Sequence, residues 1–159
     1  MSSGLTGKDR HNHHAGSNYM CLPLDPEFSP SSQEGFQSNA RMYGVEYEAG
    51  GPLIDGSLNN QDTPCAVCDV DGRSRVLMIP AKLSCPTDWT KEYVGVLMAQ
   101  NHGQSASEYI CVSDGMEIVA GGEGNDDGGL LYVVEAVCGS LPCPPYVEGY
   151  EIVCVVCTK

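Results

Sequence analysis

The chain has 159 residues, enough for one or two small domains with an apolar core, and no apolar run approaches the roughly 20 residues of a membrane span. Its 19 glycines and 10 prolines interrupt helices too often for a helical bundle or a coiled coil. With 8 basic and 21 acidic residues, the formal net charge of −13 excludes nucleic acid as an expected partner and leaves cations such as Ca²⁺ open.

Short β-strands bounded by turn residues are predicted along the whole chain. The predicted strands are 18–22, 42–47, 66–70, 76–79, 93–99, 108–112, 117–120, 130–137 and 151–156. The segment 130–137 is apolar on both faces and is predicted to be a central, buried strand. Stretches 23–40, 48–63 and 121–129 are predicted loops. The predicted fold class is therefore all-β, with short antiparallel strands and long loops.

An internal duplication is the most informative pattern in the sequence. Three blocks of the first half recur in the same order in the second half, at offsets of 90, 89 and 89 residues: Ser-Asn-Tyr-Met-Cys-Leu from position 17, Met-Tyr-Gly-Val-Glu from position 42, and Cys-Ala-Val-Cys from position 65. We therefore predict two tandem pseudo-repeats, residues 1–80 and 81–159, forming a duplicated sandwich closed by disulfides.

The first pseudo-repeat is expected to be incomplete at its N-terminal side. Cys85 precedes Cys111 by 26 residues, but no cysteine stands at the same distance before Cys21. We expect the first repeat to lack its opening strand and one cysteine, which explains an odd total of nine. A longer precursor is the expectation that follows.

Nine cysteines in a Gly/Pro-rich acidic chain indicate disulfides and an extracellular location; zinc binding by the two Cys-x-x-Cys pairs is the alternative. Cys138 and Cys143 bracket a turn-rich loop and are expected to pair. Cysteines three apart on a strand point to opposite faces, so each member of a Cys-x-Val-Cys pair needs its own partner. The candidates are Cys111 and Cys85 for Cys154 and Cys157, and Cys21 for one of Cys65 and Cys68, leaving the other unpaired.

Candidate metal ligands are few. Asp126 and Asp127 lie in a glycine-rich frame that offers oxygen ligands for Ca²⁺, and His13 and His14 belong to a histidine cluster near the N-terminus. An exposed hairpin tip and an exposed polar loop are the competing interpretations. Asp-Val-Asp-Gly from position 69 starts like a calcium loop, but no closing glutamate follows in register, which indicates a tight turn.

No enzymatic activity is expected. The sequence lacks a Gly-x-Ser-x-Gly elbow, a phosphate-binding glycine loop and a His-Glu-x-x-His motif. Three of its four histidines lie in one terminal cluster, which leaves little material for a general base. No cofactor other than Ca²⁺ is expected.

Several blocks together resemble the C-terminal non-collagenous domain of short-chain, spongin-type collagens, which are secreted proteins of aquatic invertebrates. The blocks are Leu77-Met78-Ile79-Pro80-Ala81, Cys85-Pro86 with Trp89, Glu108-Tyr109 before Cys111-Val112, Cys138-Gly139-Ser140-Leu141-Pro142-Cys143-Pro144-Pro145-Tyr146, and Cys154-Val155-Val156-Cys157. The chain departs from that pattern in having no Gly-X-Y run. The resemblance implies secretion, an extracellular-matrix or assembly role, and no catalytic residues.

The functional hypothesis is a secreted structural module that self-associates into a homo-oligomer or fibre. An open sheet edge could accept a strand from a neighbouring chain, and the unpaired cysteine could lock that contact. The alternative is a carbohydrate-recognition module, lectin-like and Ca²⁺-dependent, that uses the long loops to bind a glycan.

Overall fold

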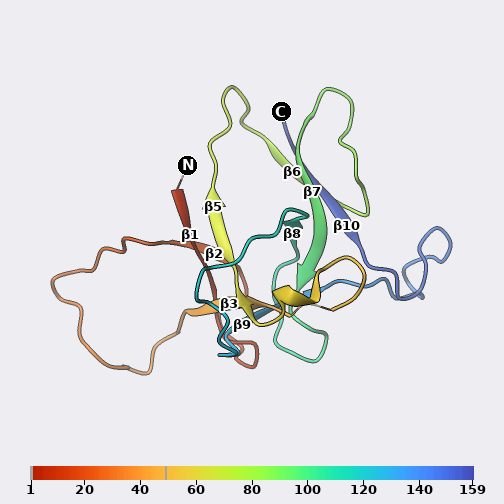
Figure 1. Ribbon diagram of the computed structural model, residues 1–159. Helices are drawn as coiled ribbons and strands as arrows, with labels where there is room; N and C mark the ends of the chain where they lie inside the picture. Colours follow the sequence, from red (N-terminus) through yellow and green to blue (C-terminus); the bar gives the residue numbers. More distant parts are fainter. Residues whose placement is uncertain (1, 49) are drawn as a thin grey trace.

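The structure, a computed structural model, describes residues 2–48 and 50–159 and is nearly all-β, which confirms the predicted fold class (Figure 1). Its strands are β1 (Ser2–Lys8), β2 (Met20–Pro23), β3 (Tyr43–Tyr47), β4 (Gln61–Asp62), β5 (Pro64–Val67), β6 (Val76–Pro80), β7 (Thr90–Ala99), β8 (Ile110–Ser113), β9 (Gly129–Val133) and β10 (Val153–Thr158). A single 3₁₀ turn, η1 (Gly56–Leu58), interrupts them. No helix in the described ranges is long and apolar enough to cross a membrane.

All ten strands of the described residues belong to one curled open sheet, which replaces the expected sandwich. Its central path is β2-β1-β3-β9-β7-β10-β6, while β5 also pairs with β1, β8 with β7, and β4 with β3. β3 and β9 run parallel, with Val45 opposite Gly129, so the sheet is not purely antiparallel as predicted. Parallel neighbours need a long connection, and β4 to β8 all lie between these two strands in the sequence.

The strands form two groups with the same pairing pattern. β1 pairs antiparallel with β2 along one edge and with β5 and β3 along the other. β7 pairs in the same way with β8, and with β10 and β9. This correspondence supports the predicted duplication, which itself remains a prediction.

The expectation that the first half lacks its opening strand stays a prediction, although β1 was not among the predicted strands. Residues 2–8 form β1, which takes the place that β7 has in the second group. The first group has no counterpart of β6 or of the following segment, which carries Cys85. β6 lies within residues 1–80 but pairs with β10, so by strand pairing it belongs to the second group.

In each group a disulfide crosses over the central strand, β1 or β7. The neighbouring backbone then comes so close that only a glycine fits in that strand. Cys21 of β2 and Cys65 of β5 flank β1, yet their Cα atoms are only 5.6 Å apart, and Cys111 and Cys154 flank β7 at 5.8 Å. In a flat sheet the two neighbours of one strand lie about 9.6 Å apart. The sheet must therefore curl sharply around β1 and β7, which brings neighbouring backbone against the central strand.

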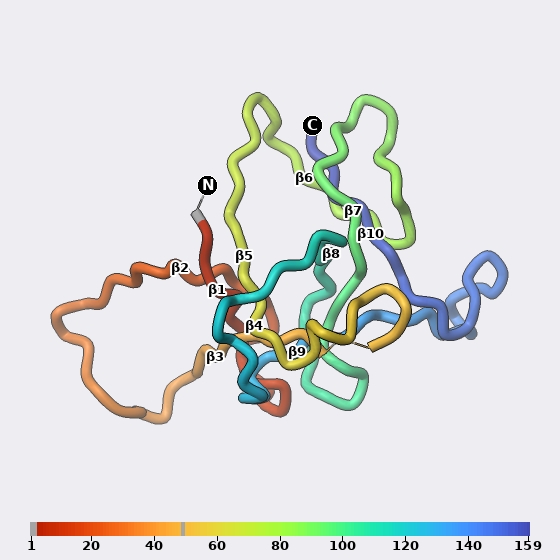
Figure 2. Tube along the Cα trace, viewed as in Figure 1, coloured from red at the N-terminus to blue at the C-terminus, as the bar shows by residue number. Residues whose placement is uncertain are grey.

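The loop after β2 and the segment between β9 and β10 extend away from this curled body (Figure 2). The predicted loop 23–40 forms an extended, exposed excursion between β2 and β3, and the segment between β9 and β10 carries the Cys138–Cys143 disulfide. The predicted strand 117–120 is absent. Its backbone instead follows β4 irregularly, with the Val119 amide donating to the Asp62 carbonyl at 3.1 Å. A two-residue β4 offers too short a ladder for a regular neighbour.

The apolar core lies where the two groups meet. Its buried members come from β3, β7, β9 and the loop before η1: Val45, Tyr47, Ile54, Val96, Met98 and Leu131. The parallel β3–β9 pair runs through this cluster, so the two groups share one core rather than building two.

Gly95 tests the curled geometry directly. A Cβ at Gly95 would lie 1.8 Å from the Val112 carbonyl oxygen, so alanine must push β8 away from β7. We expect Gly95→Ala to lower the free energy of unfolding by roughly 3 kcal/mol, measured by urea denaturation under non-reducing conditions. Gly44→Ala in β3 is the control, because a Cβ there meets nothing within 4 Å. Equal stability of the two variants would contradict the close approach.

Candidate functional site

The cysteines form four disulfides and leave one free thiol. The pairs are Cys21–Cys65, Cys85–Cys157, Cys111–Cys154 and Cys138–Cys143. Cys154 and Cys157 take different partners, and Cys138 pairs with Cys143, in agreement with the sequence-based pairing. Cys68 is free and exposed. Because Cys65, Cys154 and Cys157 are held in disulfides and only Cys68 remains a thiol, the two Cys-x-x-Cys pairs do not form the alternative zinc site.

β5 and β10 differ in what lies on their outer edges. β10 is covered by β6 along its whole length, from Cys154 opposite Pro80 to Thr158 opposite Val76. β5 pairs only with β1 within the part of the chain that the structure describes. Cys157 finds its partner Cys85 shortly after β6, whereas Cys68 follows β5 and has none. The uncovered edge and the free thiol therefore lie together.

The outward backbone groups of β5 can be assigned from its ladder with β1. The Thr6 amide donates to the Thr63 carbonyl at 3.0 Å, and antiparallel pairs alternate, so Cys65 and Val67 bond toward β1. The amide and carbonyl of Ala66 consequently point away from β1. Pro64 has no amide to present, and Val67 is 59% exposed.

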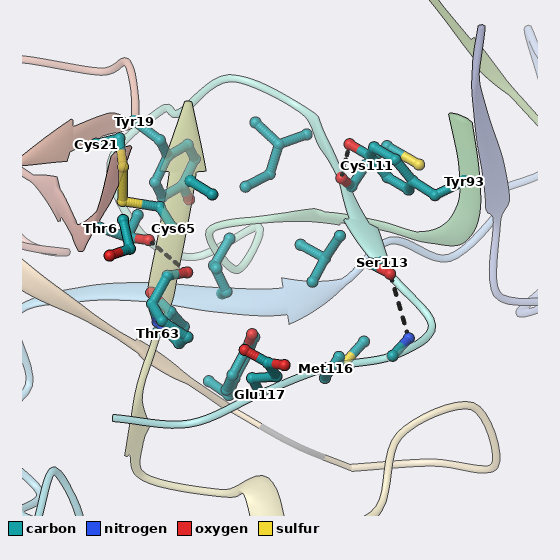
Figure 3. Close-up of a pocket in the computed structure, with 18 of the residues that line it drawn as sticks. Thr6, Tyr19, Cys21, Thr63, Cys65, Tyr93, Cys111, Ser113, Met116 and Glu117 are labelled. Carbon is teal, nitrogen blue, oxygen red and sulfur yellow. Dashed lines mark hydrogen bonds between the residues drawn. A yellow bond between two sulfur atoms is a disulfide. The ribbon is translucent and has the colours of Figure 1, made fainter. Parts of the chain in front are cut away.

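An apolar groove of about 530 Å³ lies between β5 and β8 (Figure 3). The Cys21–Cys65 disulfide lies at one side and Tyr93 with Cys111 at the other, with Met116 and Glu117 below (Figure 3). The Tyr93 hydroxyl donates to the Cys111 carbonyl at 2.9 Å. Burial raises the pKa of Tyr93, and the charge of the nearby Cys68 adds to that shift. Cys68 thus lies at the groove, beside Tyr93.

Tyr19 forms part of the groove wall and is held as a neutral hydrogen-bond donor. Its hydroxyl donates to Ser107 Oγ at 3.2 Å and to the Leu130 carbonyl at 3.3 Å. Burial raises the pKa of Tyr19 to about 12. The groove therefore carries no ionised tyrosine at neutral pH. Its lining is mainly apolar, and Glu117, the Cys68 thiol and a few serine and threonine hydroxyls are among its polar groups.

The predicted metal ligands are not brought together. His13 Nδ1 lies 3.1 Å from Asp9 Oδ1, and its ring stacks edge-on against Tyr43, while His14 is exposed. Within residues 2–48 and 50–159, the only group of three or more ligand atoms within 4.8 Å of one another is Cys138, Cys143 and Glu148. Those two sulfurs are bonded to each other, so that group does not offer thiolate ligands.

Asp126 lies instead beside two carboxylates that the sequence analysis did not single out, Glu46 and Asp62. Burial raises the pKa of Glu46, and the charges of Asp62 and Asp126 raise it further, against hydrogen bonds from the Asp126 and Gly128 amides. Burial and the charge of Asp126 likewise raise the pKa of Asp62. One glutamate within β3 is a weak sequence signal, and β4 is too short to predict.

Lys8 and Asp9 form a buried polar cluster at the end of β1. Lys8 is 1% exposed, and its Nζ donates to Gln100 Oε1 at 2.8 Å. Asp9 is 3% exposed, and its Oδ1 accepts from the Arg10 amide at 2.9 Å. Gln100 follows β7 directly, so this cluster joins the two strand groups.

A second, polar pocket of about 560 Å³ lies on another face. Two tyrosines line it, Tyr109, which is 62% exposed, and Tyr132. Amides and acids also line it: Asn59, Gln100, Asn101, Glu48 and Glu135. The pocket combines flat aromatic surface with hydrogen-bonding groups.

Comparison with known proteins gives no family to assign: no family model, no curated protein and no solved structure matches the chain. Function is therefore argued from the free thiol, the uncovered strand edge and the chemistry of the two pockets.

The Asp9 cluster predicts how stability depends on pH. Burial alone would raise the pKa of Asp9, but hydrogen bonds from the His13 ring and from the Arg10 and Ala15 amides outweigh it and hold the pKa below its ordinary value. Such a carboxylate stabilises the fold above its unfolded-state pKa of about 3.9, and this contribution is lost as the pH falls through the lowered value.

We therefore expect the free energy of unfolding to fall less steeply in Asp9→Asn than in the wild type as the pH is lowered from about 5. Urea denaturation at a series of pH values measures this dependence. Asp25→Asn, in the exposed loop after β2, is the control and should keep the wild-type dependence. An unchanged pH dependence in Asp9→Asn would show that Asp9 does not contribute.

Proposed function

We propose that this protein is a secreted structural module that self-associates through the outer edge of β5, with Cys68 linking two copies covalently. The supporting observation is the contrast between the two strands. β10 is covered by β6 and tied by Cys85–Cys157, whereas no described strand covers the outer edge of β5, and the free thiol of Cys68 follows it. Four disulfides fit an oxidising compartment. The resemblance to the terminal domain of short-chain collagens supports the same role.

A second copy of the chain is the occupant that fits this edge. Two β5 strands pairing antiparallel about a two-fold axis make an isologous contact, in which each copy offers the other the same backbone groups. The two Cys68 thiols meet when the axis lies at Cys68, directly after β5, and the outward amide and carbonyl of Ala66 then pair with the segment just beyond Cys68 of the other copy. The exposed side chain of Val67 supplies apolar area to the contact. A fibre then needs a further contact, for which the outer edge of β6, with its exposed Val76, is available.

The wild type is expected to run as a dimer on a non-reducing gel and as a monomer after reduction. Cys68→Ser should remove the covalent dimer and leave a weaker, concentration-dependent association, measured by size-exclusion chromatography with light scattering. Ala66→Pro removes the outward amide of β5 and should abolish that association in the Cys68→Ser background. Ala66→Val, which keeps the amide, is the matched control.

A monomeric wild type with a titratable thiol at high concentration would contradict the proposal. So would association that survives Ala66→Pro as well as it survives Ala66→Val. Electron microscopy separates a closed dimer from a fibre.

Glycan binding is the second candidate, favoured by the polar pocket. Tyr109 and Tyr132 offer aromatic faces on which a sugar ring can stack, and the surrounding amides and carboxylates match sugar hydroxyl groups. The proposed ligand class is a neutral or cationic sugar, because the chain is strongly acidic.

A glycan array, read with Ca²⁺ and with a chelator, tests this candidate. We expect Tyr109→Ala to lose binding by at least about tenfold. Tyr150→Ala, which removes an equally exposed tyrosine that does not line the pocket, should bind as the wild type does. An array without hits under both conditions would exclude the candidate.

A further inference from the structure

Glu46 and Asp62 face each other across the β3–β4 ladder. The Thr63 amide donates to the Val45 carbonyl at 2.9 Å, so Val45 and Thr63 form a hydrogen-bonded pair. The next pair, Glu46 and Asp62, is then of the non-hydrogen-bonded kind, in which side chains approach most closely. Two carboxylates directly opposite each other destabilise an antiparallel pair unless a positive charge lies between them.

The glycine-rich loop between β8 and β9 closes over this pair. The Asp62 amide donates to the Gly122 carbonyl at 2.8 Å, and a Cβ on Gly122 would lie 2.7 Å from Asp62 Oδ2. Further along the loop, the Asp126 amide donates to Glu46 Oε1 at 3.1 Å. The loop thus holds the exposed carboxylate of Asp126 beside a half-buried Asp62 and a buried Glu46.

The environment of Glu46 is an independent indication of a bound ligand at this position. Its side chain is only 2% exposed, and its second oxygen, Oε2, accepts no hydrogen bond in the described ranges. A buried carboxylate oxygen without a partner carries a large desolvation cost. No described basic side chain forms an ion pair with Glu46, Asp62 or Asp126. Arg10 reaches the loop but donates through Nε to the Asp127 carbonyl at 3.0 Å.

We propose that Glu46, Asp62 and Asp126 bind a Ca²⁺ ion between β3, β4 and the loop 121–128. All three ligands are carboxylate oxygens, the donor type that Ca²⁺ prefers, and no thiol or imidazole joins them to favour zinc. Loop carbonyls and water complete the six to eight ligands of Ca²⁺. Among the described residues these three carboxylates do not yet converge within 4.8 Å, so Asp126 must turn inward onto the ion.

The site joins the two strand groups, because β3 and β4 belong to the first and the loop leads into β9 of the second. Bound Ca²⁺ would therefore stabilise the whole sheet as well as the loop. The proposed Ca²⁺ site does not depend on self-association, so we test it in the Cys68→Ser variant. If either proposal fails, the other still stands.

The experiment measures Ca²⁺ binding by isothermal titration calorimetry and its effect on the melting temperature. We expect a single site with Kd of roughly 10⁻⁴ to 10⁻³ M, typical of extracellular modules, and a rise in Tm with Ca²⁺ that Mg²⁺ does not reproduce. Asp126→Asn, an exposed change that leaves the fold undisturbed, should weaken binding at least about tenfold. Glu46→Gln should abolish it and melt at a higher temperature than its parent without Ca²⁺, because it removes a buried charge.

Glu27→Gln, in the exposed loop after β2, is the matched control and should bind as its parent does. An equal rise in Tm with Mg²⁺ and with Ca²⁺ would indicate that either ion only screens the net charge of −13, and it would contradict the proposed site. Absence of binding, or undiminished binding in Asp126→Asn, would overturn it too.

Discussion

The structure depends on how tightly the sheet curls around its two central strands. Disulfides join β2 to β5 over β1 and β8 to β10 over β7, at Cα separations well below those between next-nearest strands of a flat sheet. Gly4 and Gly95 make this possible, because a Cβ at either position would run into the carbonyl of the strand alongside. The disulfide and the glycine depend on each other. The disulfide imposes the curl, and only a glycine leaves room for the carbonyl of the neighbouring strand.

The same arrangement explains why the two strand groups end differently. In the second group β6 covers β10, and Cys85 follows to meet Cys157. In the first group no strand of residues 2–48 and 50–159 covers the outer edge of β5, which lies beside the apolar groove, and Cys68 follows it unpaired. An uncovered strand edge next to a free thiol is a liability for a protein that must remain monomeric. It is an asset for one that assembles, which is why we place the proposed function there.

The buried charged groups also differ in whether they have a partner. Lys8 is buried between the groups and bonded to Gln100, whereas the carboxylates of Glu46 and Asp62 face each other with no described basic partner. The chain has 8 basic residues against 21 acidic ones, and among the described residues none of the basic side chains neutralises Glu46 or Asp62. The Ca²⁺ ion that we propose would supply the counter-charge, and the glycines of the loop give its backbone the freedom to let Asp126 adjust to it.

The sequence alone determined the all-β class, the extensive disulfide bonding and eight of the ten strands to within a few residues, because short apolar segments between turn residues and a high cysteine content are local signals. Only the tertiary structure decided that Ser2–Lys8, rich in glycine and serine, is a central strand, that 117–120 is not one, and that β3 and β9 run parallel. It also decided that Glu46, Asp62 and Asp126 lie near one another. Strand propensity is weak and is overruled by long-range pairing, and contacts between distant segments leave no mark on the sequence around each residue.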